Sequence, residues 1–208
     1  MSDSRDFSRA IALRTGPART AALACWVQSL YPAGRRKPVL VGGAAVELYT
    51  GGAYTTGDLD FVGSAPPEVA RALEGAGFRR ARRHWVQEAA QVFLEFPGSE
   101  LEPASEPVEL TFSGRRVVVV PIEGLLVDRL AAWKFWRSGV DAVNALLLLR
   151  AGAYPVDLPT ARRLGRLEEV DDELERPIQW AQRLGTRTPS ADEIETWLAE
   201  GRRTEREP

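Results

Sequence analysis

The segment from Val39 to Gly63 reads VLVGGAAVELYTGGAYTTGDLDFVG. It begins with a short apolar run, passes through Gly42-Gly43 into a helical pattern, and ends in the alternating sequence Asp58-Leu59-Asp60-Phe61. Residues i and i+2 of a β-strand point to the same face of the sheet. The pattern therefore predicts two carboxylates, those of Asp58 and Asp60, that project side by side from one short strand.

Carboxylates at this separation, and glycines at this position, indicate the same kind of chemistry. Two adjacent carboxylates repel each other unless a cation lies between them. Mg²⁺ is the usual cation for such oxygen ligands, and it normally also binds substrate phosphates. A strand that ends in Gly42-Gly43 and enters a helix lets the backbone approach a phosphate closely, and the helix N-terminus offers N–H groups to the anion. Phosphoryl or nucleotidyl transfer needs both features.

These residues resemble the nucleotidyltransferase fold of the polymerase-beta type. More narrowly, they are similar to the bacterial small nucleotidyltransferases grouped with the abortive-infection type IV toxins. The shared pattern is a Gly-Gly or Gly-Ser turn, a short helix and Asp-hydrophobic-Asp, and Gly42, Gly43, Asp58 and Asp60 match it position by position. Thr56 resembles the Ser or Thr often found two residues before the first Asp. The basic residue that members often carry just before this Ser or Thr is absent here.

The resemblance covers about residues 39–150 and implies an enzyme. That enzyme would use Mg²⁺ and move a nucleoside monophosphate from an NTP to a hydroxyl group on RNA, a protein or a small molecule. Asp58 and Asp60 would hold the metal, and Gly42, Gly43 and Thr56 would contact the nucleotide. The toxin-like relatives also imply a toxin–antitoxin setting with an antitoxin partner. The alternatives are a catalytically inactive nucleotide-binding or interaction protein that keeps the fold, and a structural domain whose acids are incidental.

Polymerase-beta-type catalysis usually adds a third carboxylate from a neighbouring strand, which would act as general base for the attacking hydroxyl. Two positions compete for this role. Glu95 lies in the expected strand from Gln91 to Phe96, which is predicted to pair beside the strand of the aspartates, whereas Glu109 lies on the first strand of a later hairpin. Chain order favours Glu95. A site without a third carboxylate would bind nucleotide or metal without efficient transfer.

The helices expected after the sheet carry charges that resemble further nucleotide contacts of the family. Toxin-like members have a basic residue and an acid on these helices, facing the nucleotide, and Lys134, Arg137 and Asp141 resemble that group. A lysine there would act as a point charge for phosphate. Asp128-Arg129 is an alternative, and ordinary solvated charge on a helix face is another.

Several basic and aromatic residues have two interpretations. The arginines of one short region are Arg71, Arg79, Arg80, Arg82 and Arg83. Such a patch would suit a phosphate-rich acceptor such as RNA, but a charged edge strand that discourages aggregation has the same composition, and we favour the edge strand. His84, the only histidine, is expected to be incidental. Trp133 and Trp136 are expected to be core anchors rather than platforms for base stacking.

Composition limits the class of protein. The 208 residues are 44% hydrophobic and 27% charged, with a net charge of −2; this indicates a globular chain and argues against a generally basic protein that coats nucleic acid. The single cysteine, Cys25, excludes an intramolecular disulfide. No apolar run is long enough for a membrane span, and the first ten residues lack the hydrophobic core of a signal peptide. We therefore expect a cytoplasmic protein without a membrane partner.

The order of elements predicts the fold class. Strand, helix, strand, helix and further strands are followed by helices only, which is the order of an α+β fold. We expect a nucleotidyltransferase-like mixed sheet of about five strands with flanking helices, in which residues 79–85 and 91–96 each form one strand. A boundary near Pro121 would separate this core, residues 1–120, from a helical C-terminal portion, residues 121–208.

Overall fold

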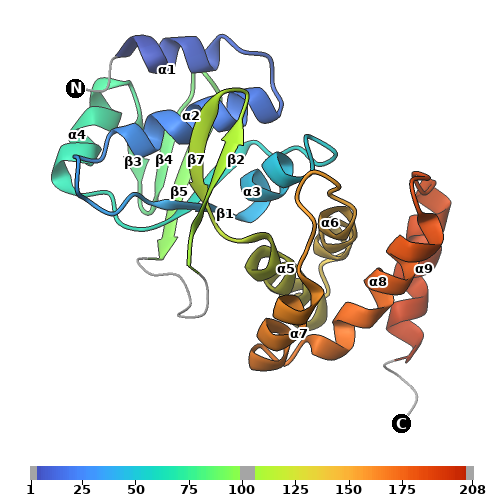
Figure 1. Cartoon of the computed structure of the whole chain (residues 1–208). Helices are drawn as coiled ribbons and strands as arrows, with labels where there is room; N and C mark the ends of the chain where they lie inside the picture. Colours follow the sequence, from blue (N-terminus) through green and yellow to red (C-terminus); the bar gives the residue numbers. More distant parts are fainter. Residues whose placement is uncertain (1–3, 99–105, 205–208) are drawn as a thin grey trace. The chain divides into compact units, whose positions relative to one another are not determined.

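The computed structural model describes residues 4–98 and 106–204 (Figure 1). The chain divides into two compact units, Met1–Pro121 and Ile122–Pro208. This division falls beside Pro121, next to the boundary that the sequence suggests. The first unit contains the sheet and the second is helical.

The strands of the first unit form one mixed sheet. They are β1 (Val39–Val41), β2 (Asp58–Val62), β3 (Arg79–Ala81), β4 (His84–Gln87), β5 (Val92–Gly98), β6 (Val108–Phe112) and β7 (Arg115–Val119). Within the described residues the sheet has seven strands in the order β3-β4-β5-β2-β1-β7-β6. The pairs β2–β5 and β1–β7 are parallel, and the other pairs are antiparallel. The expected α+β fold is confirmed.

The expected number of about five strands is wrong, since the sheet has seven within the described residues, and residues 79–85 contribute to two strands rather than forming one. The chain turns between Ala81 and His84, where Arg82 has a φ of +59°. Arg80 and Trp85 become cross-strand partners in the hairpin. The pattern of apolar residues did not indicate this turn. Its sequence contains no glycine, and a positive φ is uncommon for other residues.

Four helices accompany the sheet in the described part of the first unit: α1 (Ser4–Ile11), α2 (Pro17–Ser29), α3 (Gly42–Tyr49) and α4 (Pro67–Gly75). The helix α2 begins with Pro17, which is favourable in the first turn because its missing N–H would have no partner there. Gln28 of α2 is buried and bonds the backbone of β7, donating to Val118 O at 2.7 Å and accepting from Val118 N at 2.9 Å. These bonds fix α2 along the sheet. The helix α1 was not predicted from the sequence.

The strand β2 has one buried and one polar face. Leu59 and Phe61 are 4% and 0% exposed, whereas Asp58 is exposed and Asp60 is half-buried. Alternate side chains of a strand point to opposite faces. The core therefore holds β2 in a register that turns both aspartates to the other face.

The second unit contains α5 (Ile122–Trp136), α6 (Gly139–Leu149), α7 (Leu158–Leu167), α8 (Asp171–Leu184) and α9 (Ala191–Thr204). An aromatic group joins three of these helices: the ring centroid of Trp197 lies 5.2 Å from Trp133 and 4.6 Å from Trp180. Trp133 is 8% exposed, as expected of a core anchor. Trp136 is 82% exposed, so its expected role in the core is wrong. Trp136 is the last residue of α5, and Arg137 then turns the chain away with a φ of +58°.

No helix in the described part of the chain combines the length and the apolar character that crossing a membrane requires.

Candidate active site

The turn from β1 into α3 brings the paired aspartates and the two glycines together. In the sheet, Val41 is the partner of Asp60, so the end of β1 lies beside the middle of β2. Gly42 follows with a φ of +64°, and a Cβ atom built on it would lie 2.5 Å from Asp60 Oδ2. Only a glycine fits here, because it tolerates this φ and leaves room for the carboxylate.

Gly43 lies against the loop that leads into β2. A Cβ atom at Gly43 would lie 3.2 Å from Cβ and Oγ1 of Thr56, and at the same distance from Tyr54 Cε1. Thr56 Oγ1 also accepts a hydrogen bond from the backbone N–H of Asp58, at 3.4 Å. The structure therefore brings Gly42, Gly43, Thr56, Asp58 and Asp60 into one group.

Glu95 lies in the strand next to the aspartates. The strands β2 and β5 are parallel, with Asp58 opposite Phe93 and Asp60 opposite Glu95. Paired residues of neighbouring strands share a face of the sheet, so Glu95 lies on the face of the two aspartates. The alternative residue, Glu109, lies on the edge strand β6, with β7 and β1 between it and β2. Of the two candidates, Glu95 is therefore the one that lies on the strand next to the aspartates.

Two basic side chains of the β3–β4 hairpin hold the Glu95 carboxylate. Arg83 Nε lies 2.5 Å from Glu95 Oε1, and His84 Nδ1 lies 3.4 Å from Oε2. His84 is also the cross-strand partner of Glu95, so it lies directly beside that carboxylate. No signal in the sequence indicated this, because the pairing depends on the turn at Arg82.

The donor chemistry of this face fits a hard divalent cation, since it offers carboxylate oxygens from Asp58, Asp60 and Glu95. The backbone of Gly42 packs closely on the Asp60 carboxylate, where a Cβ atom would lie 2.5 Å from Oδ2. Among the residues that the structure describes, however, no three His, Cys, Asp or Glu side chains lie close enough together to hold a metal ion. The two aspartates fit such an ion, and Glu95 would have to leave Arg83 before joining them.

A buried acid behind the turn was not foreseen from the sequence. Glu47 of α3 is 0% exposed, and Thr20 Oγ1 donates a hydrogen bond to its Oε2 at 2.9 Å. Burial raises the pKa of Glu47, while the hydrogen bond from Thr20 and the backbone N–H of Thr56 lower it. The available signal was the single charge in the apolar helix that follows Gly42-Gly43.

The charged residues expected on the later helices pair with different partners. Lys134 Nζ lies 2.8 Å from Asp172 Oδ1 and 2.6 Å from Glu169 O, and thus connects α5 to the start of α8. Asp141 instead accepts a hydrogen bond from Arg129 at 2.7 Å. Arg129 also contacts its neighbour Asp128, the other suggested acid. The structure therefore does not bring Lys134 and Asp141 together into one group.

The arginine-rich region forms an edge of the sheet. The strand β3 is the terminal strand and its three residues are exposed. Arg79 forms an ion pair with Glu88, and the guanidinium of Arg80 lies 5.8 Å from the ring centroid of Trp85. These contacts agree with the favoured interpretation, a charged strand that protects a sheet edge.

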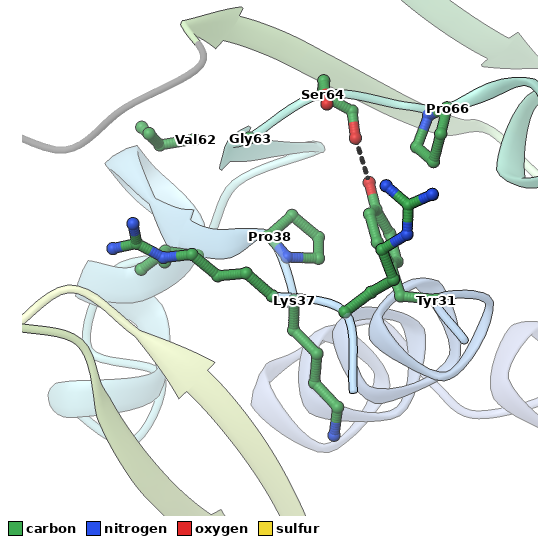
Figure 2. Close-up of a pocket in the computed structure, with 10 residues that line it drawn as sticks. Tyr31, Lys37, Pro38, Val62, Gly63, Ser64 and Pro66 are labelled. Carbon is green, nitrogen blue, oxygen red and sulfur yellow. Dashed lines mark hydrogen bonds between the residues drawn. The ribbon is translucent and has the colours of Figure 1, made fainter. Parts of the chain in front are cut away.

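A separate pocket lies at the opposite end of β1 and β2, where Val39 pairs with Val62 (Figure 2). Tyr31 forms one wall and donates a hydrogen bond from its hydroxyl to Ser64 O at 2.8 Å. Burial raises the pKa of Tyr31. Figure 2 shows that the Lys37 side chain points away from Ser64. This pocket does not include the aspartates.

Comparisons with known proteins find two similar solved structures at low sequence identity. No family model and no curated protein matches the sequence. A crystal structure of an antigenic nucleotidyltransferase-like protein from Paracoccidioides brasiliensis shares 17% identity, covering 78% of this chain and 91% of that protein, with a TM-score of 0.49. The solution structure of the antibiotic-resistance factor ANT(2″)-Ia shares 18% identity, covering 96% and 94%, with a TM-score of 0.40. These values assign no activity to this chain.

Proposed function

We propose that the protein is a Mg²⁺-dependent nucleotidyltransferase that moves a nucleoside monophosphate from an NTP to a hydroxyl group. The observation that carries this proposal is the packing of the Gly42 backbone against the Asp60 carboxylate, with Asp58 on the same face of β2. Such an arrangement places possible metal ligands beside backbone N–H groups that suit phosphate. The family resemblance of the same residues supports it.

Each group has a stated role in this reaction. Asp58 and Asp60 would hold Mg²⁺, which when bound would neutralise charge on the phosphates. The N–H groups at the start of α3 would bind phosphate oxygens, and Thr56 would hold the loop against Gly43. Glu95, once released from Arg83, would accept the proton of the acceptor hydroxyl. The acceptor oxygen would form a bond to the α-phosphorus as the bond to pyrophosphate breaks.

The acceptor classes that suit the proposal are RNA, a protein and a small molecule, and a toxin–antitoxin pair is the setting that the resemblance implies. Transfer of label from α-labelled NTPs tests these classes one by one. Expression of the wild type should slow bacterial growth if the protein is a toxin, and Asp58→Asn should relieve the effect. Asp192→Asn, at an exposed aspartate of α9, is the matched control.

A second candidate function is nucleotide binding without turnover. It is favoured by the contacts of Glu95, both of whose carboxylate oxygens lie near basic groups of the hairpin. Arg83→Gln separates the two candidates. In an active enzyme Arg83 holds Glu95 away from the acceptor hydroxyl, so its loss should raise kcat for transfer by roughly 1.4- to fivefold, since exposed ion pairs contribute ~0.2–1 kcal/mol.

The control for this variant is Arg79→Gln, which removes an arginine of the same hairpin that pairs with Glu88. The control should leave kcat unchanged. Binding of Mg²⁺–NTP by both variants and by wild type, with no labelled product from any of them, would favour the second candidate.

A further inference from the structure

The pocket at the far end of β1 and β2 is lined by positive charge, and the proposed reaction assigns it no role (Figure 2). Three consecutive cations, Arg35, Arg36 and Lys37, are among its ten lining residues, and none of these described residues is acidic. All three side chains are exposed. The whole chain has a net charge of −2, so the pocket is a local concentration of positive charge.

The fold does not use these three cations. In the part of the chain that the structure describes, their side chains make no hydrogen bond and no ion pair. Other arginines of the first unit differ in this respect, since Arg79 pairs with Glu88 and Arg83 with Glu95. The charges at the pocket are therefore available to an anionic ligand.

Several contacts hold the walls of the pocket in place. Tyr31 is 8% exposed, and its hydroxyl donates a hydrogen bond to Ser64 O at 2.8 Å, which joins the segment after α2 to the segment after β2. Gln28 Nε2 donates to Pro38 O at 3.0 Å. Gly63 packs on Pro38, where a Cβ atom would lie 3.0 Å from the proline Cβ. The walls are therefore formed before a ligand binds, which reduces the entropy lost on binding.

The volume of the pocket limits what it admits. The cavity measures about 140 Å³, close to the ~150 Å³ of an engineered cavity that holds benzene. Pockets for drug-sized ligands are larger, at roughly 300–1,000 Å³. One phosphate group fits the smaller space, whereas a whole nucleotide does not. Guanidinium groups bind phosphate oxygens in a bidentate manner, so the pocket suits a single phosphate of a longer molecule.

The pocket lies on the strand that carries the aspartates. Val62 lines the pocket and follows Asp60 by two residues on β2. The pairing with β1 is in step, Val39 with Val62 and Val41 with Asp60, so Val62 and Asp60 share a face of the sheet. Two residues of a strand span about 7 Å. A molecule with one phosphate in the pocket therefore needs only a short extension along β2 to reach Asp60.

We propose that this pocket binds a backbone phosphate of RNA, and that Arg35 and Arg36 contact the phosphate oxygens. The RNA strand is then the acceptor of nucleotidyl transfer, so this inference deepens the proposed function and rests on it. RNA fits better than an acidic protein, because every nucleotide brings a phosphate and a strand offers one to the pocket and others to the neighbouring cations. Lys37, whose side chain points away from Ser64 (Figure 2), adds charge beside the pocket.

The double variant Arg35→Gln with Arg36→Gln tests the proposal. Binding of a fluorescent single-stranded RNA of mixed sequence is measured by anisotropy at several salt concentrations, without NTP or Mg²⁺. For single strands, the logarithm of the binding constant falls with the logarithm of the salt concentration by about 0.7 per neutralised phosphate. Loss of two contacts should therefore make the slope shallower by about 1.4. If both proteins bind equally at 1 M salt, this slope means roughly 25-fold weaker binding by the variant at 0.1 M.

The matched control is Arg163→Gln with Arg166→Gln. These two arginines are exposed on α7 in the second unit, and their loss changes the net charge by the same amount. The control should keep the affinity and the salt dependence of wild type. Circular dichroism and thermal unfolding check that both double variants are folded.

Tyr31→Phe tests whether the pocket itself, and not only its charge, binds the phosphate. The substitution removes the hydrogen bond that joins Tyr31 to Ser64 and leaves every charge in place. RNA affinity should fall about fivefold, the scale of one ordinary hydrogen bond, and the salt dependence should stay unchanged. Wild-type affinity in Tyr31→Phe would overturn the pocket as the place where the phosphate binds.

The outcomes separate this inference from the proposed function. RNA binding that depends on Arg35 and Arg36, in a protein that transfers label from no NTP, overturns the proposed function and keeps the phosphate site. Active wild type whose double variant binds RNA with wild-type affinity overturns the phosphate site alone. Absence of RNA binding by wild type, or equally tight binding of a poly-glutamate peptide, also overturns it. A raised KM for RNA in the double variant, with an unchanged KM for the NTP, supports both.

Discussion

At the level of single residues, the candidate site depends on Gly42 having no side chain. Its φ of +64° and the closeness of Asp60 Oδ2 are two independent constraints on the same position. A left-handed conformation costs a residue other than glycine roughly 1–2 kcal/mol. The carboxylate contact adds a clash that only movement of Asp60 relieves.

Gly42→Ala should therefore lower the free energy of unfolding by about 1–2 kcal/mol and also weaken Mg²⁺-dependent nucleotide binding. Urea denaturation and calorimetry measure the two effects separately. The control is Gly57→Ala, because a Cβ there meets nothing within 4 Å and Gly57 has no positive φ. Wild-type binding by Gly42→Ala would contradict the assigned contact with Asp60.

The buried acid predicts a pH dependence of stability. Burial raises the pKa of Glu47 above its usual value of 4.5, so the folded state favours the neutral acid. Its contribution to stability is fully present below the unfolded value and is lost as the pH rises through the raised folded value. Glu47→Gln has no such group.

The free energy of unfolding of wild type relative to Glu47→Gln should consequently fall as the pH increases from about 4.5. Urea denaturation of both proteins across this range checks the prediction. A difference that stays constant with pH would show that Glu47 has the same pKa in the folded and unfolded states.

At the level of helices and strands, contacts between neighbouring elements explain charges that had suggested nucleotide binding. Lys134 joins α5 to the Glu169–Asp172 region, and it lowers the pKa of Asp172 through a hydrogen bond. Arg129 and Asp141 join α5 to α6. Ion pairs between helices of the second unit therefore explain why these charged residues are present.

Lys134→Met should therefore destabilise the protein by about 1 kcal/mol, the scale of a hydrogen-bonded ion pair that is partly exposed. The substitution should leave nucleotide affinity unchanged, because Lys134 already contacts Glu169 and Asp172 within the second unit. Thermal unfolding and nucleotide titration measure the two effects. A loss of affinity with unchanged stability would assign Lys134 to the nucleotide instead.

At the level of the whole molecule, the local sequence pattern predicted the two strands around the candidate site, including the one that carries the two aspartates. The apolar run before Gly42-Gly43 and the alternation through Asp58 and Asp60 predicted β1, β2 and the shared face of the carboxylates. The expected pairing of β2 with the strand of Glu95 is also confirmed. Short-range periodicity is sufficient for the strands and for the shared face because each depends on neighbouring residues, whereas the pairing was inferred from chain order.

Features that depend on distant contacts were not predictable in this way. The contact of Arg83 and His84 with Glu95 requires the hairpin turn at Arg82, and the burial of Glu47 requires α2 to supply Thr20. Exposure of Trp136 depends on where α5 ends in relation to its neighbours. Tertiary context decides each of these, and no local pattern records it.

Titration of Mg²⁺–NTP into wild type and Asp60→Asn tests the central claim most directly. Each NTP is titrated with and without Mg²⁺, and Asp192→Asn is the control. The account predicts binding that requires Mg²⁺ and falls by at least about tenfold in Asp60→Asn, the scale of losing a charge-assisted contact. Equal binding by wild type and Asp60→Asn, or no binding of any NTP by wild type, would contradict it.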